Sequence, residues 1–146
     1  RNSCDCRERD VTERENRDDF RRLVKELDYV IGNEHEWSSL YQTDLSSALE
    51  QAAADAGVVV CTRSGEEVIL VRGDETATVP VNRVVPVDAT GAGDQFAAGF
   101  LYGLATGQAL ATCGRMGCVA AAEVISHFGA RPETDLKALF RKEGLI

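Results

Sequence analysis

The chain lacks any uninterrupted hydrophobic run long enough to cross a bilayer, although 44% of its 146 residues are hydrophobic. It also lacks an excess of positive charge. The formal net charge is −8, which argues against nucleic acid or an anionic membrane surface as the main partner. The highly charged first residues do not resemble a secretory signal. The length is sufficient for one modest domain with a hydrophobic core.

Cysteine is present, but not in a pattern that indicates a zinc site or a disulfide framework. The five cysteines are an odd number, and no two of them have C-x2-C spacing. Cys4 and Cys6 have no histidine nearby, and Cys113 and Cys118 lie in an alanine-rich helical stretch where we expect small core residues. This usage is typical of a reducing compartment, so we expect a cytoplasmic protein.

The order of elements predicts an α/β layered domain. Residues 1–16 are dense in charge and are expected to form a poorly ordered leader, and residues 17–146 form the domain. Apolar spacing predicts helices over 18–27, 45–56, 96–107 and 109–126 and after Asp135, and strands over 29–31, 58–61, 68–71 and 77–81. Gly73 and Asp74 are expected to form the turn between the last two strands. Helices and strands in this order are typical of a layered α/β fold.

A glycine-rich turn, Gly91-Ala92-Gly93, is followed at once by Asp94 and a helical pattern. Such a turn exposes backbone N–H groups at a helix N-terminus, where they and the helix dipole form an anion site. An acid beside an anion site is electrostatically unfavourable, so we interpret Asp94 as a base next to a phosphate. The small residues 97–99 would let this helix approach its neighbours closely.

Other nucleotide motifs fit this turn poorly. The dinucleotide-binding fingerprint requires Gly or Ala where Phe96 stands, and a P-loop requires a Lys followed by Ser or Thr after the glycines. A purely structural interpretation stays open, in which the glycines form a tight turn and the helix dipole favours Asp94.

The longer segment from Asp88 to Phe100 resembles the second signature of the ribokinase-like (PfkB) family of sugar and nucleoside kinases. The resemblance implies the layered α/β fold of that family, of which residues 17–146 would be only the C-terminal, nucleotide-binding portion. It implies that Asp94 takes the proton of a substrate hydroxyl. It also implies that the N–H groups of Gly91, Ala92 and Gly93 stabilise the phosphoryl group in transfer.

Two upstream segments are similar to further motifs of the family. Asn33-x-x-Glu36 matches an N-x-x-E motif, which implies that Glu36 contacts Mg²⁺ through water. A helix N-cap with acids in the first turn is the structural alternative. Thr62 and Ser64 match a strand-end segment that contacts nucleotide phosphates and ribose, although Glu67 stands where the family has a glycine.

Residues 126–132 resemble the C-terminal loop of the family. The resemblance implies a monovalent cation, such as K⁺, held by Asp88, Thr90 and backbone carbonyls around Gly129. A helix terminator without an ion is the alternative, and both stay open. The alanine-rich stretch 117–125 would form one wall of an adenine pocket, or pack tightly against another helix.

The resemblance as a whole implies an ATP-dependent phosphotransferase that acts on a hydroxymethyl group of a sugar or nucleoside. Residues 123–132 are most similar to bacterial adenosine-kinase-like members. Because the substrate-binding half of the family is not matched, a truncated, non-catalytic nucleotide-binding module is the alternative. Unpaired strand edges and apolar faces would also favour a homodimer.

Overall fold

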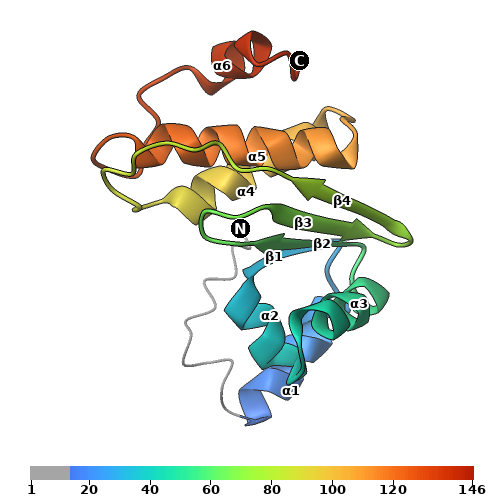
Figure 1. Cartoon of the computed structure of the whole chain (residues 1–146). Coiled ribbons are helices and arrows are strands. Elements are labelled where there is room, and N and C mark those ends of the chain that lie inside the picture. The colour runs from blue at the N-terminus through green and yellow to red at the C-terminus, as the bar shows by residue number, and fades with distance from the viewer. Residues whose placement is uncertain (1–13) are drawn as a thin grey trace. The chain divides into compact units, whose positions relative to one another are not determined.

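The computed structural model describes residues 14–146, with side chains from Asn16 onward. These residues divide into two compact units (Figure 1). The first contains the chain up to Ser64 and Val68–Ala77, and the second contains Gly65–Glu67 and Thr78–Ile146. Residues 1–13 of the predicted leader, with Cys4 and Cys6, lie outside the described residues. No helix among the described residues is long and apolar enough to span a membrane.

The elements follow the predicted order, and a helix follows the first strand at the point where Asn33 was expected to be an N-cap. The first unit contains α1 (Arg14–Val24), β1 (Tyr29–Asn33), α2 (Glu34–Tyr41), α3 (Leu45–Asp55), β2 (Val58–Thr62) and β3 (Val68–Arg72). Strand β4 (Glu75–Val79) begins in the first unit and ends in the second. The second unit contains α4 (Ala92–Ala105), α5 (Leu110–Ile125) and α6 (Leu136–Lys142).

The strands form one sheet in the order β1-β2-β3-β4. Strands β1 and β2 are parallel, with Asn33 opposite Thr62 at their carboxyl ends, and β2 and β3 are antiparallel. The bounds predicted for the last strand, 77–81, are wrong, because β4 begins and ends earlier and spans Glu75–Val79. Pro80 follows it directly and has no N–H to donate to a ladder, which explains why the strand ends there.

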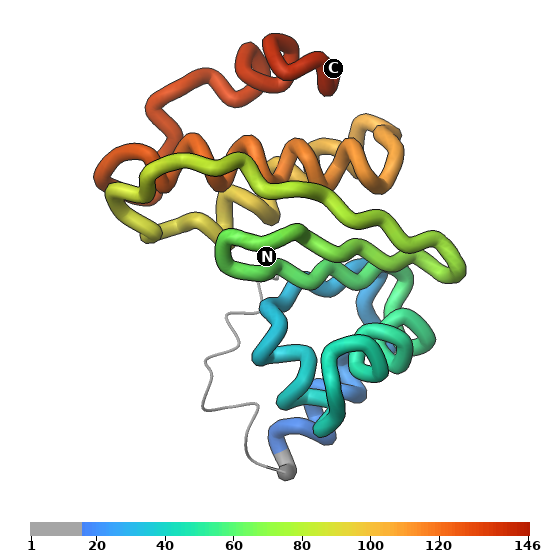
Figure 2. The backbone as a smooth tube through the Cα atoms, viewed as in Figure 1, coloured from blue at the N-terminus to red at the C-terminus, as the bar shows by residue number. Residues whose placement is uncertain are grey.

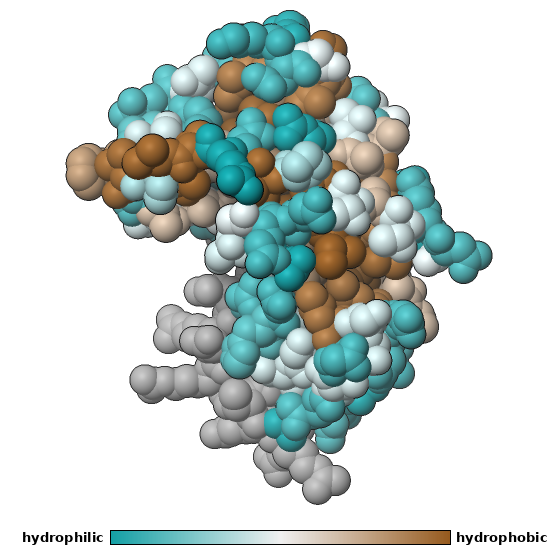
Figure 3. Space-filling view, in the orientation of Figure 1, coloured by the Kyte–Doolittle hydropathy of each residue, from teal (hydrophilic) through white to brown (hydrophobic). Residues whose placement is uncertain are grey.

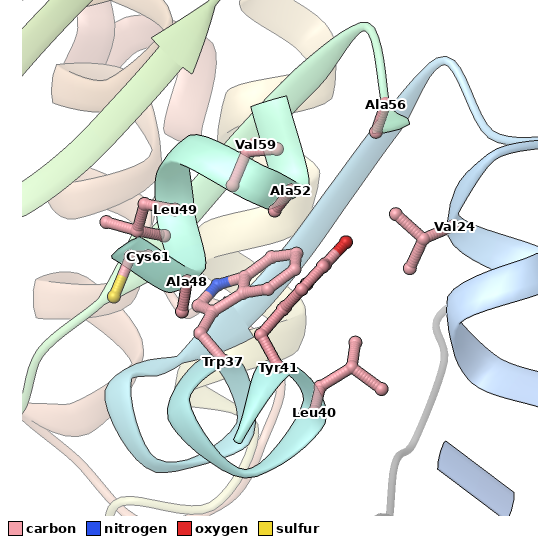
Figure 4. Close-up of a cluster of buried hydrophobic side chains, with 10 residues drawn as sticks. All are labelled: Val24, Trp37, Leu40, Tyr41, Ala48, Leu49, Ala52, Ala56, Val59 and Cys61. Atoms are coloured by element: carbon pink, nitrogen blue, oxygen red, sulfur yellow. The ribbon is translucent and has the colours of Figure 1, made fainter. Parts of the chain in front are cut away.

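The core of the first unit lies between its helices and one face of the strands (Figure 4). Strand β2 is buried along Val58–Cys61, as predicted from its apolar run. Trp37 of α2 is 2% exposed, and its indole N–H donates to the carbonyl of Val60 at 3.0 Å. Tyr41, one turn later, stacks on Trp37 with ring centroids 6.3 Å apart and donates its hydroxyl to Asp55 at 3.0 Å. These contacts hold α2 and α3 against each other and against β2.

In the second unit, α4 and α5 form a tightly packed antiparallel pair. A Cβ placed on Gly99 would lie 2.5 Å from the carbonyl oxygen of Met116, and one on Gly103 would lie 2.9 Å from the Cα of Cys113. The close approach predicted for residues 97–99 is therefore confirmed for Gly99, whereas Ala98 is exposed. Cys113 and Cys118 are buried free thiols, as predicted. Helix α6 packs on α5 through Phe140. The Phe140 ring also stacks on Tyr102 of α4, with ring centroids 6.0 Å apart.

Candidate functional site

The N-terminus of α4 presents unpaired backbone donors. Gly91 is the N-cap, with φ 80° and ψ 3°, and supplies no side chain to cap the helix. The N–H of Ala92 donates to the carbonyl of Ala89 at 3.2 Å. Among the described residues, none accepts a hydrogen bond from the N–H of Gly91, Gly93 or Asp94. The first turn of a 14-residue helix therefore leaves donors available to an anion.

The side chains around this turn leave it open to solvent. Asp94 is exposed in the first turn of α4, and Gly93 beside it is exposed as well. A Cβ on Gly93 would meet no atom within 4 Å, and its φ is not positive. Nothing in the fold therefore requires glycine at this position. Phe96, by contrast, is buried and its ring lies against Gly117 of α5.

Asp88 organises the segment that leads into α4. Its Oδ1 accepts hydrogen bonds from the Thr90 hydroxyl at 2.6 Å and the Thr90 N–H at 2.9 Å, and its Oδ2 accepts the N–H of Gly129 at 3.0 Å. These donors, the Thr90 hydroxyl foremost, lower the pKa of Asp88 to about 2. The segment runs alongside α5 (Figure 2), where the N–H of Val87 donates to the carbonyl of Ile125 at 2.8 Å.

The loop between α5 and α6 contacts the start of α4. A Cβ on Gly91 would lie 2.7 Å from the Cβ of Ala130, and the Gln95 amide donates to the carbonyl of Ala130 at 3.3 Å. The same loop is held to α5 by Glu123, whose carboxylate accepts the N–H groups of Glu133 at 3.0 Å and Thr134 at 2.8 Å. The loop is therefore fixed at one end by α5 and in its middle by α4.

The side chains of Glu123 and His127 lie next to each other at the end of α5. Their side chains are 7% and 15% exposed, and Nε2 of His127 lies 3.4 Å from Oε2 of Glu123. Burial raises the pKa of Glu123, but the hydrogen bonds from Thr134 and His127 outweigh it and leave that pKa below its ordinary value. The hydrogen bond to the carbonyl of Phe128, together with Glu123, raises the pKa of His127.

The upstream candidates lie in the first unit. Asn33 and Glu36 form a capping box at the start of α2: the Asn33 side chain accepts the N–H of Glu36 at 2.9 Å, and Oε2 of Glu36 accepts the N–H of Asn33 at 2.6 Å. The Thr62 hydroxyl donates to the carbonyl of Gly32 at 3.4 Å, and Ser64 is exposed two residues beyond β2. Asn33 and Thr62 thus meet at the carboxyl edge of the parallel strands, where open α/β sheets bind ligands.

The side chains around Asn33 and Glu36 fit a magnesium ion whose other ligands are water and phosphate oxygens. The described residues contain no group of three His, Cys, Asp or Glu side chains that could hold a metal by themselves. Mg²⁺ usually takes one or two carboxylates and keeps waters and phosphate oxygens. Glu36 suits this mode, because only its Oε2 is used in the capping box and none of the described residues donates to Oε1.

The structure brings the candidates together in two groups. Asn33, Glu36, Thr62 and Ser64 belong to the first unit. Asp88, Thr90, Gly129 and the turn from Gly91 to Asp94 belong to the second. Sequence reasoning missed Glu123 and Gln95, which fix the loop around Ala130. The available signal for Glu123 was an acid in an alanine-rich helix with a histidine four residues later.

Hydrophobic side chains remain exposed beside the second group. Figure 3 shows them gathered over the loops that lead into α4 and out of α5. The exposed large residues there are Val84, Val85 and Val87 before the turn and Phe128 after α5, with Val85 86% and Phe128 81% exposed. Exposed apolar side chains beside unpaired N–H donors suit a ligand with an anionic part and an apolar or aromatic part.

The family model for "pfkB family carbohydrate kinase" matches residues 1–136. An uncharacterized sugar kinase of Archaeoglobus fulgidus is 37% identical over 115 residues, which cover 77% of this chain and 46% of that protein. Solved relatives include a probable sugar kinase from Rhizobium etli and the adenosine kinase from Sinorhizobium meliloti. The first is 42% identical with a TM-score of 0.85 and covers 89% of this chain and 41% of its own. The second is 38% identical with a TM-score of 0.83 and covers 87% of this chain and 40% of its own.

These matches confirm the ribokinase-like α/β fold that the motifs imply, over part of its length. This chain spans less than half the length of each of these relatives. The matched family model covers most of the chain, including both groups of candidate residues. The chain belongs to the pfkB family of carbohydrate kinases.

Proposed function

We propose that this chain supplies the ATP-binding and phosphoryl-transfer part of a kinase that phosphorylates a hydroxymethyl group of a sugar or nucleoside. The relatives support this choice of acceptor class, since two are named sugar kinases and one is named an adenosine kinase. The observation that carries the proposal is the exposed carboxylate of Asp94 beside unpaired N–H groups at the N-terminus of α4.

In the proposed reaction, Asp94 accepts the proton of the acceptor hydroxyl while the hydroxyl oxygen bonds to the γ-phosphorus of ATP. The bond between that phosphorus and the bridging oxygen breaks, and ADP leaves with the electron pair. The N–H groups of Gly91, Gly93 and Asp94 would stabilise the negative charge on the transferring group. Ala92 was also expected to donate, but its N–H is directed to Ala89, so we assign it no such role.

The remaining candidates are proposed to bind the nucleotide and its cations. Ser64 would donate its hydroxyl to phosphate oxygens next to Asn33, and Thr62 would do so by rotating its hydroxyl away from the carbonyl of Gly32. Glu36 would hold Mg²⁺ through a water on Oε1, and the metal would neutralise phosphate charge. Asp88, Thr90 and the carbonyls around Gly129 would hold K⁺. The Asp88 carboxylate would then bind the ion while it also accepts its three hydrogen bonds from Thr90 and Gly129.

The Asp94→Asn variant tests whether Asp94 is the base. Asp94→Asn keeps the size of the side chain but removes its basicity, so we expect binding of MgATP within about threefold of wild type and turnover reduced by about 10²–10⁴-fold. Calorimetry measures the binding, and a coupled ADP-release assay over a panel of sugars and nucleosides measures the turnover. The assay uses the protein at its natural length, and Asp74→Asn in the β3–β4 turn is the matched control.

Three outcomes separate the hypotheses. Turnover that persists in Asp94→Asn would contradict the role of Asp94 as base. Binding of MgATP by the wild type without phosphorylation of any acceptor would favour the non-catalytic nucleotide-binding module instead. Neither binding nor turnover would leave only a structural role for this domain.

A further inference from the structure

We infer that Glu123 is a positioning residue for the donors at the N-terminus of α4, which it reaches through the loop between α5 and α6. The inference rests on the proposed function for its kinetic consequence, but its structural link is independent of catalysis. Glu123 lies on α5, and none of its side-chain hydrogen bonds reaches the turn from Gly91 to Asp94 at the start of α4 (the α4 turn). Its influence would therefore pass through the loop backbone.

The first link joins Glu123 to the far end of the loop. One oxygen, Oε1, accepts two successive backbone N–H groups, of Glu133 at 3.0 Å and of Thr134 at 2.8 Å. The other, Oε2, faces Nε2 of His127 at 3.4 Å, at the near end of the loop. Hydrogen bonds to an ionised carboxylate are stronger than neutral ones. A single side chain thus closes the loop at both ends.

The second link joins the middle of the loop to the α4 turn. The N–H of Gly129 donates to Asp88, the side chain of Ala130 lies against Gly91, and the carbonyl of Ala130 accepts the Gln95 amide. Each of these contacts depends on where the loop backbone lies. A loop released at Glu123 would therefore lose its alignment with Asp88 and Gly91.

The position of Glu123 is unfavourable for α5 itself. It lies in the last turn of the helix, where the dipole disfavours an acid, and its side chain is only 7% exposed. Neither the helix dipole nor contact with solvent therefore explains an acid there. The N–H groups of Glu133 and Thr134, which donate to Glu123 from the loop that follows, and the neighbouring His127 side chain supply the compensation.

Replacement of Glu123 tests the link by amide hydrogen exchange and kinetics. Glu123→Ala is expected to reduce protection at the Gly129 N–H, which bonds to Asp88 and not to Glu123, by at least tenfold, and to lower kcat/KM by at least tenfold. Glu123→Gln keeps an oxygen for the loop N–H groups, so it should restore most of both. Lys137→Ala, which removes an exposed side chain at the start of α6, just beyond the loop, should change each by less than twofold.

A double-mutant cycle distinguishes positioning from general stabilisation. If Glu123 acts through the loop that Asp88 holds, Glu123→Ala and Asp88→Asn should be markedly less than additive in kcat/KM. Should Glu123→Ala fail to fold, Glu123→Asp, whose carboxylate is one methylene short, replaces it in the cycle. Full additivity, or a lower unfolding temperature with unchanged protection at Gly129, would overturn the inference. Lost protection at Gly129 in a protein without kinase activity would support the link and reject the proposed function.

Discussion

The N–H of Gly129 donates a hydrogen bond to Oδ2 of Asp88 at 3.0 Å, between residues 41 positions apart in sequence. The same carboxylate accepts both the N–H and the hydroxyl of Thr90. One side chain therefore fixes the segment before α4 to the loop after α5. We therefore expect the geometry of the turn from Gly91 to Asp94 to depend on the ionisation of Asp88.

Acid is expected to weaken this connection in a defined pH range. The Thr90 hydroxyl, with the N–H groups of Gly129 and Thr90, lowers the pKa of Asp88 from 3.8 to about 2 in the folded protein. Because the folded pKa is the lower one, the stabilisation is present above pH 3.8 and is lost as the pH falls through about 2. Asp88→Asn lacks this titration, so its unfolding temperature should converge on that of the wild type over this range. A constant difference between the two proteins would contradict the assignment.

Gly91 is expected to tolerate no side chain. Gly91→Ala would place a Cβ 2.7 Å from Ala130 on a residue with φ 80°. The left-handed backbone alone costs about 1–2 kcal/mol for alanine, and the contact adds to it. Gly107→Ala is the matched control, because Gly107 has φ 73° and open space around it. Urea unfolding should therefore show a larger loss for Gly91→Ala, and equal losses would mean that Ala130 moves away without cost.

The same substitution in α4 should have opposite effects at two positions. Gly99→Ala places a Cβ 2.5 Å from the Met116 carbonyl oxygen, so α4 and α5 must separate, and we expect a loss of about 1–3 kcal/mol in unfolding free energy. Gly93→Ala meets no atom within 4 Å and should gain up to about 1 kcal/mol from helix propensity. Thermal unfolding measures both signs.

Gly93→Ala also bears on the proposed anion site. Its Cβ would occupy the open side of the turn, so MgATP affinity should fall although the fold is retained or strengthened. A variant that is more stable and binds MgATP as tightly as wild type would show that no phosphate approaches Gly93 closely.

The capping box separates the structural and metal roles of Glu36. Glutamine is an accepted partner at this position of a capping box, so Glu36→Gln should change the unfolding free energy by less than about 0.5 kcal/mol while weakening the Mg²⁺ dependence of nucleotide binding. Asn33→Ala removes the cap and should cost about 0.5–2 kcal/mol. Magnesium titrations at fixed ATP provide the measurement. An unchanged titration in Glu36→Gln would restrict Glu36 to capping α2.

Local sequence patterns were sufficient for most elements because their determinants lie within a few residues. Asn33 and Asp135 were predicted as helix N-caps, and both accept backbone N–H groups of the first turn. The turn at Gly73 and Asp74 and the buried run in β2 were also predicted correctly. The predicted end of β4 was wrong. The apolar pattern continues past Pro80 to Val81, but Pro80 has no N–H with which to pair, so the strand ends at Val79.

The sequence by itself determined the family motifs, the helix caps and the candidate base Asp94, since each depends on neighbouring residues. Tertiary structure decided which N–H donors of the α4 turn stay unpaired, and that Glu123, Gly129 and Ala130 support them. It also decided that position 99 has no room for a Cβ beside the Met116 carbonyl, whereas position 93 has open space. These properties depend on contacts between distant segments, whose geometry is set by helix packing and loop closure and not by local propensity.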